Sequence, residues 1–187
     1  MRRAEIERQN AWMLARHRRF HEAADIVADA FAAFEEVLAV AVIGSVARPL
    51  TKEVPRFRAF ARAGIEVWHE CKDLDLAVWL ESRHRLGDLR HARDVALTRV
   101  AATCGVANHQ VDVFLIEPGT DRYLGRLCRF ATCPKGKPEC RMPGCGETPF
   151  QRVVEGFRPA ADLLAHAADG MLYRRGEGRI RSALDLP

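Results

Sequence analysis

The sequence predicts an α/β (α+β) fold in which helices flank a small β-sheet, and two kinds of hydrophobic pattern support this. In residues 4–36 and 83–104, apolar residues recur at three- and four-residue steps, the spacing of an amphipathic helix. Residues 37–43, 71–80 and 110–116 are instead short apolar or alternating runs, which are typical of strands. With 187 residues, of which 48% are hydrophobic, the chain is large enough for one domain with a real core and an appendage.

The predicted fold begins with a long helix and a buried strand. The helix covers residues 4–36. Its apolar stripe consists of Phe20, Ala24, Val27, Phe31 and Phe34. Residues 37–43 are continuously apolar, so both faces of this strand are expected to be buried. The strand ends at Gly44-Ser45, and Pro49 stops the turn or short helix that follows.

Three aspartates stand inside predicted strands, where this residue is uncommon. Asp73 and Asp75 are two positions apart in the strand at 71–80, so their carboxylates leave the same face of the sheet. Asp112 lies between valines in the strand at 110–116. Carboxylates grouped in this way can hold two divalent cations, and oxygen ligands favour Mg²⁺ or Mn²⁺ over zinc. The alternative is a wet outer face of the sheet with solvated acids.

A phosphate-binding turn is the second predicted part of the site. Gly44 lets a phosphate approach the backbone closely, and Ser45 adds a hydroxyl and an N–H group. Arg48 is near enough in the chain to add positive charge. A Gly-Ser pair after a strand is a weak signal by itself, because any strand-to-helix turn can use one. Its value depends on whether the turn lies within reach of the three aspartates.

Taken in order along the chain, these motifs resemble the DNA polymerase beta-type nucleotidyltransferase superfamily, and within it the small bacterial minimal nucleotidyltransferases. The pattern is Gly44-Ser45, then Asp73-Leu74-Asp75-Leu76, then a helix, then Val111-Asp112-Val113. The resemblance covers residues 20–118. It implies the nucleotidyltransferase fold, a small mixed β-sheet flanked by helices.

The resemblance also implies a reaction and a role for each residue. Asp73 and Asp75 would bind both catalytic metal ions, and Asp112 would bind the ion that activates the nucleophile. Gly44 and Ser45 would hold the β- and γ-phosphates of a nucleoside triphosphate. The expected reaction transfers a nucleoside monophosphate to a hydroxyl group and releases pyrophosphate. Because no large second substrate domain is predicted to follow, a protein or RNA acceptor is a better expectation than a small molecule.

The chain departs from the family between the Gly-Ser turn and the acidic strand. Here 27 residues separate the two motifs, which is more than the family pattern needs. The added material is the basic, aromatic-bearing segment at residues 50–64. Two interpretations stay open: Arg56, Arg58 and Arg62 clamp the substrate or its triphosphate, or the segment is a solvated insertion that packs through its phenylalanines.

A different kind of metal site is predicted in residues 121–150. This turn-rich stretch contains Cys128, Cys133, Cys140 and Cys145, spaced C-x4-C-x6-C-x4-C. Four soft ligands in an aperiodic Gly/Pro loop suit tetrahedral zinc, whose binding would supply the stability that apolar burial cannot. With four protein ligands, such a site is expected to be structural. An iron–sulfur cluster and free thiols or redox disulfides are the alternatives.

The last part of the chain is predicted to be helical and then basic. Pro159 suits the first turn of a helix. The apolar face of this helix contains Leu163, Leu164, Ala167 and Met171. An arginine-rich tail follows at residues 174–181. Three segments are therefore expected: a nucleotidyltransferase domain with its N-terminal helix at 1–120, a four-cysteine loop at 121–150, and the C-terminal helix with the basic tail at 151–187.

Composition sets the expected compartment and leaves three functions open. The N-terminus lacks the apolar region of a signal peptide, and the apolar run at 37–47 is too short to cross a bilayer, so we expect a cytoplasmic protein with no membrane contact. A net charge of +4 permits an anionic ligand without demanding a nucleic acid. A nucleotidyltransferase is the leading expectation. The alternatives are an antitoxin-like protein on the same fold that binds a helical partner protein with little or no catalysis, and a zinc-stapled nucleic-acid binder.

Overall fold

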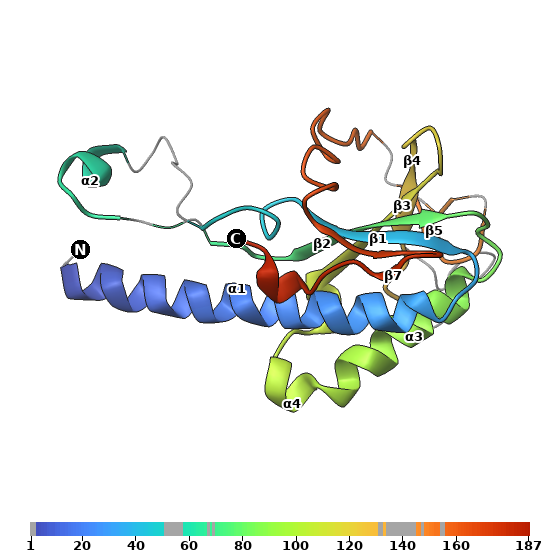
Figure 1. The fold of residues 1–187 in the computed structure, drawn as a ribbon, viewed down its shortest axis with the longest axis horizontal. Coiled ribbons are helices and arrows are strands. Elements are labelled where there is room, and N and C mark those ends of the chain that lie inside the picture. The colour runs from blue at the N-terminus through green and yellow to red at the C-terminus, as the bar shows by residue number, and fades with distance from the viewer. Residues whose placement is uncertain are drawn as a thin grey trace.

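The structure, a computed structural model, is built around one seven-stranded β-sheet (Figure 1). It describes residues 3–50, 58–66, 68, 70–130, 133, 145–146, 148–153 and 156–187. The long helix α1 (Arg3–Ala32) lies along the sheet, and its N-terminal part extends beyond the sheet (Figure 1). Among the described residues, no helix combines the length and the apolar composition that crossing a bilayer requires.

The strands pair in the order β5-β4-β3-β2-β1-β6-β7. Their bounds are β1 (Val37–Ile43), β2 (Leu74–Leu80), β3 (Val111–Ile116), β4 (Tyr123–Leu127), β5 (Gln151–Arg152), β6 (Met171–Arg174) and β7 (Gly178–Arg179). β2 and β3 run parallel, whereas the other neighbouring pairs are antiparallel. The sheet is therefore mixed, and the predicted α/β architecture of a mixed sheet with helices is confirmed at this level.

Two helices, α3 (Leu86–Arg99) and α4 (Ala101–Cys104), occupy the stretch that the sequence predicted as one helix. Between them, at Val100, the backbone leaves helical geometry, with φ of −112° and ψ of 8°. Gly105 ends α4 in the left-handed conformation, with φ of 65°, as is typical of a glycine that follows a helix.

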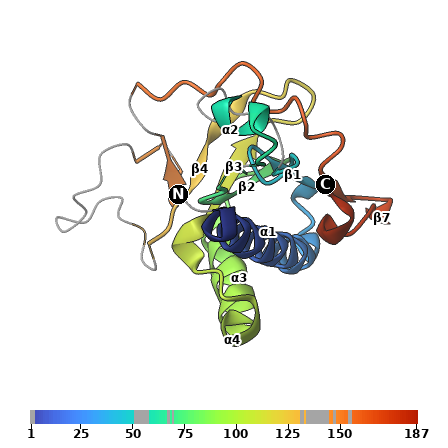
Figure 2. The ribbon, with the colours of Figure 1, turned by 90° about the vertical axis from the view of Figure 1, so that its left-hand side faces the viewer.

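The main core lies between the sheet and the helices α1 and α3. Because side chains alternate along a strand, β2 sends Leu74, Leu76 and Val78 to this face. There they belong to the same buried cluster as Phe20 and Phe31 of α1. Figure 2, which looks along the length of the molecule, shows α1 and α3 on the same side of the strands. The opposite residues of β2, which include Asp75, are therefore left on the other face of the sheet.

A smaller apolar cluster covers part of that other face. It contains Ala41, Ile43, Ala77, Phe114, Ile116 and Ala167. The predicted helix beginning at Pro159 is wrong: residues 161–170 form successive turns, and Met171–Arg174 is the strand β6. The turns are closed by bonds between residues three apart, such as that from the Leu163 N–H to the Ala160 carbonyl (2.9 Å). Packing of these apolar side chains against the sheet has overridden the helical propensity of an alanine-rich stretch.

The predicted basic tail is a β-hairpin rather than a free arm. β6 pairs with β1, and β7 pairs with β6. Arg175 donates to Glu81 (2.9 Å) and Arg179 to Asp25 (2.7 Å), so both arginines are ion-paired with earlier parts of the fold. The sheet thus continues past residue 120 and takes strands from all three of the segments that the sequence suggested.

Gly170→Ala is expected to destabilise the protein by about 2–4 kcal/mol. A Cβ atom at Gly170 would overlap the carbonyl oxygen of Val42, and the Val42 N–H already bonds to the Gly170 carbonyl at 2.9 Å. The obstacle is backbone of the central strand β1, so the strand itself has to move. Urea unfolding followed by circular dichroism measures the change.

The control for this substitution is Gly156→Ala, at a position where a Cβ atom meets nothing within 4 Å. It introduces only the strain of an alanine at φ of 71°, about 1 kcal/mol. A loss at Gly170 no larger than the loss at Gly156 would contradict the close approach to β1.

Candidate active site

The ends of three strands meet at one edge of the sheet and carry most of the predicted site residues. Asp75 is in register with Asp112 in the parallel pair β2/β3, and with Ile43 in the antiparallel pair β1/β2. Residues in register on neighbouring strands point to the same face, so the two carboxylates are neighbours. Since β1 runs opposite to β2, its last residue lies beside the first residues of the other two strands. The structure therefore brings Asp75, Asp112 and the turn at Gly44 to one place.

Gly44 makes the closest approach of the turn to the acids. Its φ of +71° favours glycine, and an ideal Cβ atom there would lie 2.5 Å from Oδ2 of Asp75. Residues 44–47 form a turn and not a helix, so no helix dipole contributes to anion binding at Ser45. The Arg48 side chain folds back over the turn, with its Nε donating to the Gly44 carbonyl at 3.3 Å.

Burial and the neighbouring acids oppose the ionisation of Asp75. The pKa of Asp75 is raised from 3.8 to about 6, first because burial penalises its charged form and next because Asp112 is negative. Asp73, exposed at a bend directly before β2, adds a smaller effect in the same direction. Arg126 and Arg129 act in the opposite direction. A bound cation would relieve the repulsion, so the electrostatics of this edge favour cation binding.

Two arginines, which the sequence did not connect with the acids, hold Asp112. Nη1 of Arg126 donates to Oδ2 at 2.8 Å, and Arg129 donates to Oδ1 through Nη2 at 2.5 Å and Nε at 3.2 Å. Arg126 reaches the carboxylate because β4 places it in register with Phe114, two residues beyond Asp112 on the same face. It is 14 residues away from Asp112 in the chain and belongs to no motif, so only the strand register reveals it.

The residues at this edge fit a divalent cation after one exchange of partners. Within the described parts of the chain, no three His, Cys, Asp or Glu side chains are arranged to hold a metal ion. Asp75 nevertheless presents a carboxylate beside the backbone of Gly44, and Asp112 presents another once its arginine hydrogen bonds are given up. All the donors are oxygens, which suits Mg²⁺ or Mn²⁺.

Two buried histidines of α1 support the turn from the side of the core. His17 and His21 place their Nε2 atoms 3.2 Å and 3.1 Å from the same acceptor, the carbonyl of Val46, and their rings are 4.3 Å apart. A carbonyl only accepts, so each Nε2 carries a proton. Burial is the main cause that lowers both pKa values, that of His17 to about 4. Their four-residue spacing is visible in the sequence, but the shared acceptor follows only from the tertiary structure.

Stability is expected to fall in acid because of His17. Burial and the nearby His21 lower its pKa from 6.5 to about 4, so below pH 6.5 the unfolded chain binds a proton that the folded chain does not. The stabilisation is complete above pH 6.5 and is lost as the pH falls toward 4, by up to about 3 kcal/mol.

The measurement for this prediction is urea unfolding at about pH 7 and about pH 5, for the wild type and for His17→Gln. Glutamine keeps an N–H donor but does not titrate. The wild type should lose about 1–2 kcal/mol more than His17→Gln between the two pH values. The titration of Asp75 is present in both proteins and cancels. Equal losses would show that His17 does not carry the effect.

Three of the four predicted zinc ligands lie in the described residues. Cys128 follows β4 and is buried, Cys133 is half-buried, and Cys145 is exposed in an isolated bridge beside β5. Cys140 lies outside the described residues. In the part of the chain that is described, these thiols form no group of three or more metal ligands, so the zinc site stays a prediction from the sequence.

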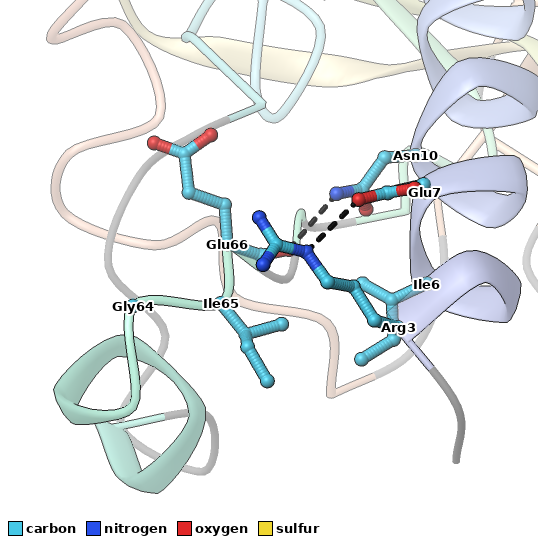
Figure 3. A pocket seen from close by; sticks show the side chains of 7 residues that line it. All are labelled: Arg3, Ile6, Glu7, Asn10, Gly64, Ile65 and Glu66. Carbon is cyan, nitrogen blue, oxygen red and sulfur yellow. Dashed lines mark hydrogen bonds and ion pairs between the residues drawn. The ribbon is translucent and has the colours of Figure 1, made fainter.

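The inserted segment carries the short helix α2 (Arg58–Arg62), which lies beyond the sheet on the side where β1 ends (Figure 1). The part after α2 approaches the N-terminal part of α1, where the Asn10 side chain donates to the Glu66 carbonyl at 2.9 Å. A hollow of about 350 Å³ opens between them (Figure 3). Its lining residues are Arg3, Ile6, Glu7, Asn10, Gly64, Ile65 and Glu66. None of them is a predicted site residue, and Arg56 of the predicted clamp lies outside the described residues.

No protein-family model, curated protein or solved structure matches this chain. Its function is therefore argued from the sheet edge where Asp75, Asp112 and Gly44 meet, and from the arginines around that edge.

Proposed function

We propose that the protein is a metal-dependent nucleotidyltransferase, which moves a nucleoside monophosphate from a nucleoside triphosphate to a hydroxyl group. The register of Asp75 with Asp112 on the parallel strands β2 and β3, with the Gly44 backbone against Asp75, is the observation that carries this proposal. Burial and the negative charge of Asp112 raise the pKa of Asp75, so the fold is less stable when Asp75 is ionised. The grouping of the two acids is accounted for if the site binds a cationic ligand, because strained electrostatics are typical of functional sites.

The three aspartates have different roles in the proposed site. When bound, Mg²⁺ or Mn²⁺ supplies the activation of the attacking hydroxyl and offsets charge on the phosphoryl oxygens. Asp73 and Asp75, at the start of β2, would hold the cations. Asp112, on the neighbouring strand, would bind the cation that activates the acceptor hydroxyl and would help to take the hydroxyl proton.

The turn after β1 supplies the proposed triphosphate site. Gly44 has no side chain, so a phosphate can approach its backbone beside Asp75. Ser45 contributes a hydroxyl from the same turn. Arg48, already folded over the turn, adds positive charge. These three residues form the nucleotide-binding part of the proposed site.

The proposed acceptor is a hydroxyl of a protein or an RNA. The segment that carries Arg58 and Arg62 lies on the side of the sheet where β1 ends (Figure 1). An acceptor that approaches the acids from this side meets positive charge, which favours an anionic molecule.

The test is incubation of the purified chain with each labelled nucleoside triphosphate and Mg²⁺ or Mn²⁺, with protein and RNA fractions as acceptors. The wild type should incorporate label, and Asp75→Ala should not. Asp88→Ala is the matched control, because Asp88 is an exposed acid on α3 and should leave incorporation unchanged. Equal behaviour of the wild type and Asp75→Ala would exclude the enzyme.

A binding protein with little or no catalysis, of the antitoxin-like kind, is the second candidate. The ion pairs of Asp112 with Arg126 and Arg129 favour it, because they satisfy this carboxylate without a metal. On this proposal the acids have a structural role through their ion pairs, and a helical partner protein binds at a surface away from them. Absence of incorporation, together with cation binding that Asp75→Ala does not change, would favour the second candidate.

A further inference from the structure

Both oxygens of the Asp112 carboxylate accept hydrogen bonds from arginine. Oδ2 accepts one hydrogen bond from Arg126, and Oδ1 accepts two from Arg129. Charge-assisted contacts of this kind are among the stronger hydrogen bonds in proteins. A cation that takes Oδ1 of Asp112 displaces Arg129, whose guanidinium group is then left beside the site without its partner.

The guanidinium group of Arg126 packs against two aromatic rings. Its guanidinium carbon lies 4.6 Å from the ring centre of Phe114 and 4.9 Å from that of Phe157. Among the described residues, its buried Nε has no hydrogen-bond partner. Contacts with aromatic faces hold a guanidinium in place without neutralising its charge. Arg126 therefore keeps a fixed positive charge next to the acids.

The charges at this edge change sign when a cation binds. Asp73, Asp75 and Asp112 against Arg126 and Arg129 leave one excess negative charge. One divalent cation turns this into one excess positive charge, and a second raises it further. The occupied site therefore attracts a polyanion, and arginine is the side chain best suited to holding phosphate oxygens.

We propose that Arg129 holds Asp112 only while no divalent cation is bound, and that it turns to the phosphates of the nucleotide, and later of pyrophosphate, once a cation takes Asp112, while Arg126 stays in place and binds the same phosphates. This inference rests on the nucleotidyltransferase proposed above. It makes cation and polyphosphate binding cooperative, because each ligand removes a partner that would otherwise compete for the other. It also makes Arg126 and Arg129 phosphate-binding residues of the site.

The test uses the whole chain and two probes, Mn²⁺ alone and inorganic pyrophosphate with saturating Mn²⁺, both measured by calorimetry. Arg129→Gln removes two of the three hydrogen bonds to Asp112. It should bind Mn²⁺ alone about fivefold to tenfold more tightly than the wild type, and pyrophosphate about tenfold more weakly. Arg122→Gln is the control, because Arg122 pairs with Glu117 and not with the acids, and it should match the wild type.

Opposite shifts of the two affinities distinguish this proposal from a merely structural arginine, which would weaken both. Arg129→Lys keeps the positive charge, so its affinities for Mn²⁺ and for pyrophosphate should lie between those of the wild type and Arg129→Gln. With this second variant, the test does not depend on Arg129→Gln being folded. Mn²⁺ binding that is not tightened in Arg129→Gln, or pyrophosphate binding that is not weakened, overturns the exchange even if the wild type transfers nucleotides. Opposite shifts without any nucleotide transfer support the exchange and exclude the transferase.

Discussion

Asp75→Asn is expected to make the protein more stable and inactive at the same time. The pKa of Asp75 is raised from 3.8 to about 6 by burial and by the charge of Asp112, so the folded chain holds an acid that resists ionisation. A shift of one pKa unit corresponds to about 1.4 kcal/mol, which sets an upper limit of about 3 kcal/mol for this penalty. Since Asp75 is only partly buried, we expect a gain of about 1–2 kcal/mol at pH 7.

The pH dependence of this gain follows from the sign of the pKa shift. A raised carboxyl pKa means that between pH 3.8 and 6 the folded state binds more protons than the unfolded state. The penalty is absent below this range and complete above it. The stability difference between Asp75→Asn and the wild type should therefore be larger at about pH 7 than at about pH 4. Urea unfolding in the absence of divalent cations measures it.

The activity of Asp75→Asn should fall by about 10³-fold or more, because the amide cannot hold a cation as a carboxylate does. Asp88→Asn, on the exposed side of α3, should change neither activity nor stability by a comparable amount. A variant at Asp75 that lost stability at pH 7 would contradict the repulsion at the sheet edge. One that kept its activity would remove this residue from the proposed chemistry.

Gly44→Ala is expected to lose activity about 100-fold while remaining folded. The new methyl group would meet Oδ2 of Asp75 at 2.5 Å, and the carboxylate is the part that can give way. The acid should therefore be displaced from the position that the proposed cation needs. The φ of +71° adds backbone strain of about 1 kcal/mol.

Gly119→Ala is the matched control for Gly44→Ala, because Gly119 has φ of +77° and a Cβ atom there would meet nothing within 4 Å. Gly119→Ala has the same backbone strain as Gly44→Ala, but its methyl group does not collide with another residue. It should therefore keep full activity. A double-mutant cycle isolates the collision: in the Asp75→Ala background, Gly44→Ala should cost no more stability than Gly119→Ala. Equal activities of the two alanine variants would show that the turn does not position Asp75.

Much of the framework can be predicted from the sequence, because local periodicity reports which face of an element is buried. The apolar run at 37–43 is β1, the alternating run at 71–80 contains β2, and the valine-flanked acid at Asp112 lies in β3. The C-cap at Gly105 could also be predicted. Gly105 directly follows the periodic stretch at 83–104, and glycine is the residue that most often ends a helix in the left-handed conformation. By contrast, the alanine-rich stretch at 161–170 has helical periodicity but folds as turns, since its packing against the sheet outweighs propensity.

The amino-acid order alone singled out the three aspartates and the Gly44-Ser45 turn as candidate site residues, because acids in or beside a strand and a glycine after one are local features. Only the tertiary structure placed Asp112 beside Asp75, set Arg126 and Arg129 against Asp112, and joined His17 and His21 to one carbonyl. These contacts join residues far apart in the chain. They depend on strand order and register, which hydrogen bonding between strands determines and which no local pattern records.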